Sequence, residues 1–172
     1  MKQVFYAIGM LMLIISGQAN AQTTETALIN RSSIVSSPFV AGTKTSIEVA
    51  KVSLSALDRF KKDYKDAKDV EWVELQNGYR AYFSQDAVLT AVDYTKKGKL
   101  YSVIRYGKEL LPAELKAKVN EMFGDMQIKE VTEVKIADYA TKAFVIVLDG
   151  KASLKTIQII ENEIIVLHEA EK

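Results

Sequence analysis

One pattern dominates the 172-residue chain: a helix-like segment followed by four strand-like runs occurs twice in succession. The first helix is predicted over 53–64, where Leu57, Phe60 and Tyr64 share one face and Ser53 is a suitable N-cap. Four runs rich in residues that favour β-structure follow this helix. They are Val70–Gln76, Tyr79–Ser84, Val88–Thr95 and Lys99–Tyr106.

The second half has the same order of elements. Pro112 is tolerated at the first position of a helix, and Gly124 is a typical residue after the end of one. The apolar stripe between them consists of Leu115, Val119, Met122 and Phe123. The strand-like runs that follow are Ile128–Ile136, Lys142–Leu148, Leu154–Ile160 and Glu163–Glu169.

The two halves can be laid on each other, for example with Val92 on Ile157, so one unit used twice is predicted, as repeats 51–107 and 108–170. An amphipathic helix and a half-buried sheet each need an apolar partner. The fold class is therefore predicted to be α+β, with two tandem α-β-β-β-β repeats. Both helices are expected to pack on one face of an antiparallel sheet.

The first 45 residues have a different character. Residues 1–21 contain Lys2, an apolar run over 4–15 and the small-residue end Ala19-Asn20-Ala21, a pattern typical of a secretory signal peptide. The run is shorter than the roughly 20 residues that a membrane span needs. We expect cleavage after Ala21, a periplasmic or secreted protein and no membrane attachment afterwards. Residues 22–45 are rich in Thr, Ser and Ala and are predicted to be a flexible leader to a domain over 46–172.

Composition excludes several functions. Lys and Arg number 23 against 22 Asp and Glu, so the chain lacks the positive charge that nonspecific nucleic-acid binding requires. The absence of Cys excludes thiol nucleophiles, disulfides and Cys-based zinc sites. The single His, His168, has no second His or Cys to complete a catalytic or metal site, and is expected to face solvent near the end of the last strand. No enzyme activity, cofactor or metal is predicted.

Several segments in order resemble a known family. They are Phe60-Lys-Lys-Asp-Tyr64, Val70-Glu-Trp72, Gly78-Tyr-Arg-Ala-Tyr-Phe83, Val92-Asp-Tyr94, Gly98-Lys-Leu-Tyr101, Leu111-Pro-Ala-Glu-Leu115 and Ile128-Lys-Glu-Val-Thr-Glu-Val134. The chain resembles the PepSY-like, beta-lactamase-inhibitor-like proteins exported by Bacteroidetes over about 51–169. The resemblance implies a secreted or periplasmic non-enzymatic domain that binds proteins or restrains proteases. The beta-lactamase inhibitor grips its enzyme with an open sheet face. That inhibitor contains disulfides and this chain has no Cys, so only the fold is carried over, not the target.

A candidate binding surface follows from strand alternation. If Asn77-Gly78 forms a two-residue hairpin turn, Trp72, Ala81 and Phe83 share the face that packs against the helix. The opposite face then carries the predicted site for an unidentified protein or peptide, a set of aromatic, arginine and aliphatic side chains of the kind that interfaces use. The predicted site residues are Val73, Arg80, Tyr82, Tyr101, Val103 and Arg105. A register slip of one residue would exchange the two faces.

Three other interpretations stay open at this point. The sheet face could lack a partner, or the leader could cover it. The chain could instead sense a small ligand in a pocket between helix and sheet, or a cation at Asp63, Asp66 and Asp69, although an acidic calcium loop also needs a glycine that this segment lacks. A hydrolase is the weakest alternative, because no set of nucleophile, base and orienting residue can be named.

Overall fold

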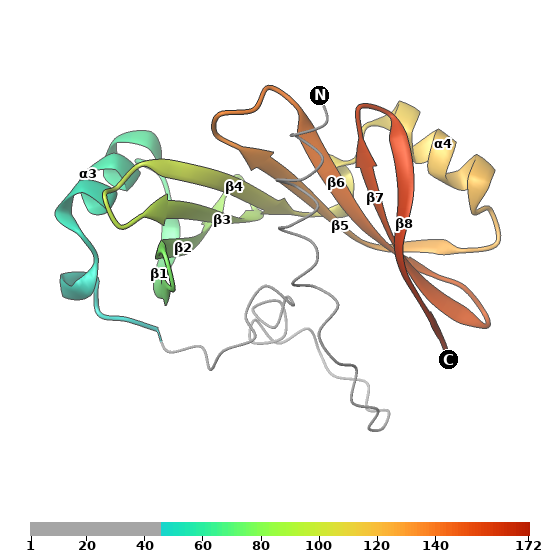
Figure 1. The fold of residues 1–172 in the computed structure, drawn as a ribbon, viewed down its shortest axis with the longest axis horizontal. Coiled ribbons are helices and arrows are strands. Elements are labelled where there is room, and N and C mark those ends of the chain that lie inside the picture. The colour runs from blue at the N-terminus through green and yellow to red at the C-terminus, as the bar shows by residue number, and fades with distance from the viewer. Residues whose placement is uncertain (1–45) are drawn as a thin grey trace. The chain divides into compact units, whose positions relative to one another are not determined.

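Eight antiparallel strands form one sheet in which each strand pairs with its neighbours in the sequence, in the order β1 to β8 (Figure 1). The computed structural model describes residues 46–172, so the predicted signal peptide 1–21 and leader 22–45 lie outside the described residues. The first half consists of η2 (Val49–Lys51), α3 (Leu54–Asp63), β1 (Lys68–Leu75), β2 (Gly78–Gln85), β3 (Val88–Thr95) and β4 (Leu100–Tyr106). The second half consists of η3 (Lys108–Leu110), α4 (Ala113–Met122), β5 (Gln127–Ile136), β6 (Lys142–Asp149), β7 (Ser153–Ile160) and β8 (Glu163–Glu171).

The predicted fold class is confirmed, because a helix and four antiparallel strands occur twice in the predicted order. Two details of α4 differ from the prediction. Pro112 lies at the N-cap with an extended ψ of 144°, so the first helical residue is Ala113. Met122 was expected in the apolar stripe, but it is 55% exposed, whereas Leu115 and Val119 are buried. Val119 and Phe123 contact the core from the end of this helix, and Met122 lies between them on the exposed side.

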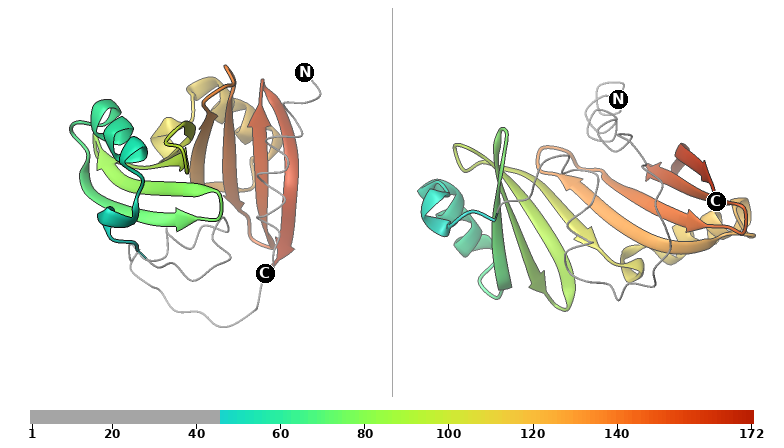
Figure 2. Two further views of the ribbon diagram at one scale, coloured as in Figure 1. Left: turned by 60° about the vertical axis from the view of Figure 1, so that its left-hand side comes forward. Right: turned by 90° about the horizontal axis from the view of Figure 1, so that it is seen from below.

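Both helices pack on the same face of the sheet. Val92, in the cluster under α3, pairs with Val103 on β4, and Val103 pairs with Lys135 on β5. Lys135 pairs with Lys142, two residues before Phe144 of the cluster under α4. Paired residues share a face and alternate residues return to it. The face that α3 and α4 cover is called the helix face below, and Figure 2 shows both helices and the sheet from two further directions.

Aromatic side chains build the core under α3. The helix starts after Ser53, whose hydroxyl accepts a hydrogen bond from the Ala56 backbone N–H at 3.3 Å, as the sequence predicts for an N-cap. Phe60 then packs edge-on against Trp72 and Phe83, with ring centroids 5.3 and 5.1 Å apart. Such edge-to-face pairs each add about 0.5–1.5 kcal/mol beyond the burial of apolar area.

Aliphatic side chains build the core under α4. Two buried helix residues, Leu115 and Val119, lie over the central strands of this half. The buried strand residues of this cluster are Val131, Phe144, Ile146, Leu148, Ile157 and Ile159. β-Branched residues suit a sheet because their stiff side chains pack well on a pleated surface.

The first hairpin turn differs from the prediction. The turn residues are Gln76 and Asn77, and Leu75 pairs with Gly78, so Trp72 lies opposite Ala81 and not opposite Phe83. A shift of two residues leaves every side chain on its predicted face, since the strand period is two. Gly78 is needed for another reason: a Cβ there would lie 1.9 Å from the backbone oxygen of Tyr94.

Candidate functional site

The candidate site occupies the face opposite α3 and α4, called the second face below, over which no helix from residues 46–172 lies (Figure 2). Three of the predicted site residues share it. Val73 pairs with Arg80, and Tyr82, two residues further along β2, pairs with Ala91 on β3. The sequence therefore assigned β1 and β2 to the correct faces.

The other three predicted residues do not share this face. Val103 pairs with Val92 of the core under α3, and Arg105 lies two residues further along the same side of β4. Both therefore belong to the helix face. Tyr101 falls at a β-bulge, where the pairing of Asp93 with Ser102 is followed by that of Tyr94 with Leu100. The predicted common surface of six residues is wrong, because the bulge changes the phase of β4 in a way that the hairpin turn does not reveal.

The predicted site residues also differ from the expectation of an open binding surface in how far they are exposed to solvent. Val73, Arg80 and Tyr82 are 4%, 0% and 5% exposed, whereas Tyr101 is 43% exposed. The three predicted residues on the second face are thus buried, and the most exposed of the six lies elsewhere. On the helix face, Arg105 is held between the two cores by Glu133, whose carboxylate also contacts Lys142 at 3.0 Å.

A buried ion pair anchors the first half of the second face. The Arg80 guanidinium donates two hydrogen bonds to the Asp93 carboxylate, from Nε at 2.5 Å and from Nη2 at 2.8 Å. The Ser102 hydroxyl donates to the same carboxylate at 2.7 Å, and Arg80 Nη1 donates to the Tyr82 hydroxyl at 3.3 Å. Burial lowers the pKa of Arg80, but the hydrogen bonds and charge of Asp93 outweigh that effect and raise it. Arg80 therefore stays charged.

An apolar band continues the second face from the ion pair across the middle of the sheet. Ile104 on β4 pairs with Val134 on β5, and Val134 pairs with Ala143 on β6, which pairs with Ile160 on β7. The members of this apolar band are Ile104, Val134, Ile136, Ala143 and Ile160, and each of them is 5% exposed or less. The second face thus combines an apolar centre with an ordered charged group at one side.

Sequence reasoning missed Asp93, Ser102 and the apolar band. Asp93 lies between two residues that favour β-structure, in Val92-Asp-Tyr94. An acidic residue in an otherwise apolar central strand indicates a buried ion pair, because buried charges are generally paired. Arg80 in the neighbouring predicted strand was the available partner. The apolar band depends on three strand pairings in succession, from β4 to β7, and no local pattern supplies them.

A hollow lies on the helix face, beside the C-terminal part of α3. A cavity of about 450 Å³ is lined by Arg59, Tyr64, Lys99, Leu100, Val103, Lys135, Ala137 and Asp138. Its outer wall is the β5–β6 link, which the Lys99–Asp138 ion pair at 2.8 Å and the Ala137 N–H bond to the Tyr101 carbonyl hold in place. The cavity has an aliphatic and aromatic floor and a rim richer in cations than in anions.

The other chemical candidates find no support in the part of the chain that the structure describes. No three His, Asp or Glu side chains gather there in a way that could hold a metal ion, so Asp63, Asp66 and Asp69 do not form a cation site. Asp63 instead pairs with Arg59 one helical turn earlier. His168 is exposed on β8, opposite Thr156. None of the helices in residues 46–172 has the length and apolar character to span a membrane.

Comparison with known proteins identifies relatives by structure alone. No protein-family model matches the sequence, and no curated protein matches it either. A solved protein of Bacteroides eggerthii that is described as periplasmic superposes with a TM-score of 0.59 at 19% identity, covering 70% of this chain and 88% of its own. A DUF2874 family protein of Bacteroides ovatus gives 0.60 at 16% identity, with the same coverages of 70% and 88%.

A BLIP-like protein from Bacteroides fragilis matches as well, with a TM-score of 0.55 and 19% identity over 70% of this chain and 86% of its own. Identities this low speak to the fold and not to activity. The fold that the sequence resemblance implied is therefore confirmed: this chain has the BLIP-like, α+β architecture of one antiparallel sheet with two helices on a single face.

Proposed function

We propose that this protein is an exported, non-enzymatic binding module that holds a protein or peptide on the second face of its sheet. The observation that carries the proposal is the apolar band beside the Arg80–Asp93 pair, on a face over which no helix of residues 46–172 lies. An apolar centre with an arginine and a tyrosine at its side is the composition that protein interfaces favour. Binding would occupy the partner's surface and would involve no bond chemistry.

Export to the periplasm or outside the cell is part of the same proposal. The signal-peptide pattern of residues 1–21 supports it, as does the description of the Bacteroides eggerthii relative as periplasmic. Inhibition of a protease or another enzyme is the more specific form of this function. It draws support from the resemblance to PepSY-like and beta-lactamase-inhibitor-like proteins, and from the BLIP-like structural relative.

A capture experiment tests the second face. Wild-type protein and a Tyr82→Ala, Ile104→Ala double variant are immobilised and exposed to periplasmic and secreted extract. The matched control is Tyr101→Ala, which also removes a tyrosine but acts at the bulge on β4. We expect a partner that wild type and Tyr101→Ala recover equally and that the double variant loses. Circular dichroism confirms that all three proteins are folded. Equal recovery by the folded double variant, or no specific partner for wild type, would contradict the proposal.

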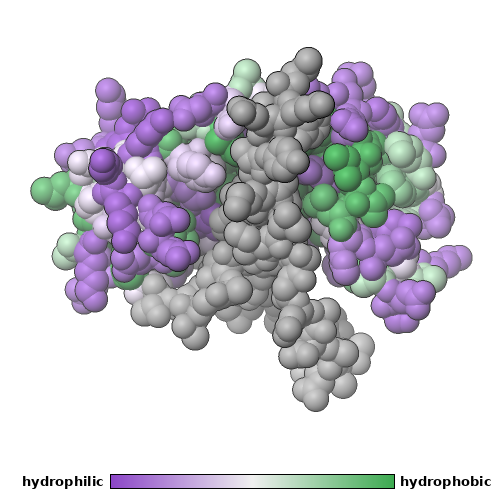
Figure 3. Space-filling model, viewed as in Figure 1, coloured by the Kyte–Doolittle hydropathy of each residue, from purple (hydrophilic) through white to green (hydrophobic). Residues whose placement is uncertain are grey.

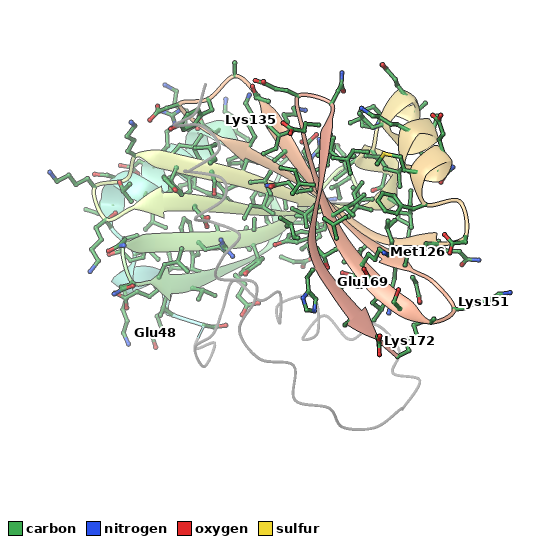
Figure 4. All side chains as sticks on the ribbon, turned by 45° about the vertical axis from the view of Figure 1, so that its right-hand side comes forward. Glu48, Met126, Lys135, Lys151, Glu169 and Lys172 are labelled. Carbon is green, nitrogen blue, oxygen red and sulfur yellow. The ribbon has the colours of Figure 1, made fainter. Side chains whose placement is uncertain are left out.

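The cavity on the helix face supports a second candidate function, a sensor of small molecules. Its 450 Å³ volume falls within the range of ordinary ligand pockets. Of the three cations that line it, Arg59 pairs with Asp63 and Lys99 with Asp138, which leaves Lys135 to attract an anionic ligand with an apolar body. Figure 4 shows Lys135 on the strand beside this cavity.

Thermal melts separate the two functions, because a ligand that binds only the native state raises its stability. Decanoate and benzoate serve as probes, with decanol and benzyl alcohol as neutral controls. A shift for the carboxylates that Lys135→Glu abolishes would favour the sensor. No shift, or equal shifts for acids and alcohols, would count against it.

A further inference from the structure

The two edges of the sheet differ in how far they are protected against another strand. β1 is covered in part by the chain that precedes it: Ser46 bridges to Val73, and the Ile47 N–H donates to the Trp72 carbonyl at 2.9 Å. A bulge between Lys68 and Glu71 also interrupts β1. Bulges, charges and covering segments are the devices by which proteins prevent edge strands from pairing with other chains.

β8 also carries a bulge, at Leu167, where the pairing of Ile157 with Val166 is followed by that of Thr156 with His168, but it has fewer of the other protections. It runs for nine residues without Pro or Lys, and within residues 46–172 only β7 pairs with it. Four consecutive apolar residues occupy its middle, Ile164 to Leu167, and three of them are notably exposed: Ile165 at 37%, Val166 at 48% and Leu167 at 37%. Figure 3 shows a hydrophobic patch in the region of β8. A long, exposed, apolar edge strand is a ready template for a further strand.

The edge is also well ordered. β8 pairs with β7 from Ile160–Glu163 at the turn to Ser153–Glu171 at the far end, with a single bulge at Leu167. The Lys172 N–H then donates to the Ala152 carbonyl, which fastens the last residue as well. An added strand would meet a template that is already in place, so little ordering of β8 would oppose binding.

Charge identifies the kind of strand that fits. Glu163 stands before the apolar residues, and Glu169 and Glu171 follow them, with no cation inside β8 (Figure 4 labels Glu169). Hydrogen bonds from the side chains of Lys155, which has the larger effect, and Ser153 lower the pKa of Glu169. This carboxylate is therefore ionised at neutral pH. The edge therefore presents acidic ends around an apolar middle.

A second copy of β8 fits this edge poorly. Antiparallel self-pairing would bring the end of β8 that carries Glu163 close to the end of the other copy that carries Glu169 and Glu171, and like charges brought together are destabilising. An extended segment with an apolar middle and lysines or arginines at both ends would instead pair each of its ends with a glutamate.

We propose that the free edge of β8 binds an extended, basic-ended peptide segment of a partner protein as a ninth strand. Main-chain hydrogen bonds supply the affinity of such strand addition, and side-chain contacts supply the specificity. Ile165 and Val166 point to opposite faces of the sheet and would each contact alternate apolar residues of the added strand. This surface is separate from the second face and does not depend on it.

The test uses the full chain and a synthetic peptide in which Val and Thr alternate between lysine-rich ends. A peptide of the same middle with glutamate ends is the charge control. Val166→Lys disrupts the proposed site, and Val70→Lys is the matched variant on the opposite edge, where Val70 is 39% exposed. Fluorescence anisotropy gives the affinities, and hydrogen exchange reports on the β8 amides.

We expect the lysine-ended peptide to bind wild type and Val70→Lys alike and to slow amide exchange in β8. Val166→Lys should bind at least about tenfold more weakly, the loss expected when one aliphatic contact is removed and a like charge is added. The Tyr82→Ala, Ile104→Ala variant should bind as wild type does, which distinguishes failure of this proposal from failure of the second-face function.

Four results would overturn the proposal. They are no binding to wild type, equal binding of the glutamate-ended peptide, equal binding by Val166→Lys, and protection of amides outside β8 only. Concentration-dependent dimerisation that Val166→Lys abolishes, measured by sedimentation, would assign the edge to a second copy of the chain instead.

Discussion

The two halves of this protein build the same elements from different chemistry, and the pairing of β2 with β3 has the same register as that of β6 with β7. Ala81 pairs with Val92 in the first half as Ile146 pairs with Ile157 in the second. On the helix face, the first half uses aromatic rings where the second uses aliphatic side chains. The same supersecondary unit therefore tolerates either kind of core, provided that the volume between helix and sheet is filled.

The second face shows the larger difference. Arg80, Asp93 and Ser102 pair in succession across β2, β3 and β4. The corresponding positions across β6, β7 and β8 are Val145, Gln158 and Ile165. An ion pair with a hydroxyl thus stands where the other half has two aliphatic residues and an amide. The comparison indicates that the charged cluster is not a requirement of the fold, which is why we connect it with binding.

The largest expected effect comes from breaking the ion pair. Asp93→Ala removes the carboxylate that accepts two hydrogen bonds from buried Arg80, and should destabilise the protein by about 3–5 kcal/mol. The double variant Arg80→Val, Asp93→Gln copies the second half and should cost much less than the single change. Urea denaturation measures both. A double variant as unstable as Asp93→Ala would show that the cluster is needed for folding.

The next largest loss of stability is expected from truncating a buried aromatic residue under α3. Trp72 and Val131 occupy matching positions, since they pair with Ala81 and Ile146. Trp72→Ala should cost about 3–5 kcal/mol, as large-to-small changes of buried aromatic residues do. Val131→Ala removes fewer buried carbons and should cost less, about 1.5–3 kcal/mol. Equal losses in urea denaturation would contradict the view that the first half depends on individual rings.

A smaller effect of opposite sign is expected at Gln158. Its side-chain Nε2 is buried and has no hydrogen-bond partner within residues 46–172, although the residue lies where Asp93 stands in the first half. Gln158→Leu removes an unsatisfied polar group and should stabilise the protein by about 1 kcal/mol. The same change at the matching position, Asp93→Leu, should destabilise it. A loss of stability in Gln158→Leu thermal melts would show that the amide has a role that the contacts do not reveal.

The smallest effect concerns alkaline pH. Burial raises the pKa of Tyr94, whose hydroxyl has no hydrogen-bond partner among the described residues. Because the tyrosine ionises more readily when unfolded, stability is fully present below about pH 10 and falls as the pH rises further. Tyr94→Phe should match or slightly exceed wild type at neutral pH and lose less stability at alkaline pH. Identical pH profiles in urea denaturation would contradict this assignment.

The elements of the fold could be predicted from local sequence, and the site could be predicted only in part. Helices and strands can be predicted from the spacing of apolar residues and from capping residues within a short segment, as Phe60 and Ser53 show for α3. The face on which each side chain of β1 and β2 lies could also be predicted, because a short hairpin turn links these strands. The face of β4 did not, because the bulge at Tyr101 changes its phase. Asp93 and Ser102 meet Arg80 only after two strand pairings are known, and no single segment contains that information.

The strict order of the sheet, β1 to β8 along the chain, has a consequence for how the protein folds. Each pairing closes a loop between neighbouring strands, with α4 and its flanks as the one longer insertion, between β4 and β5. Short loops lose little chain entropy on closing, and folding rates rise as contacts become more local. Hairpins can therefore form in either half and extend strand by strand, so that a sheet of this size reaches its native pairing without a slow search among distant segments.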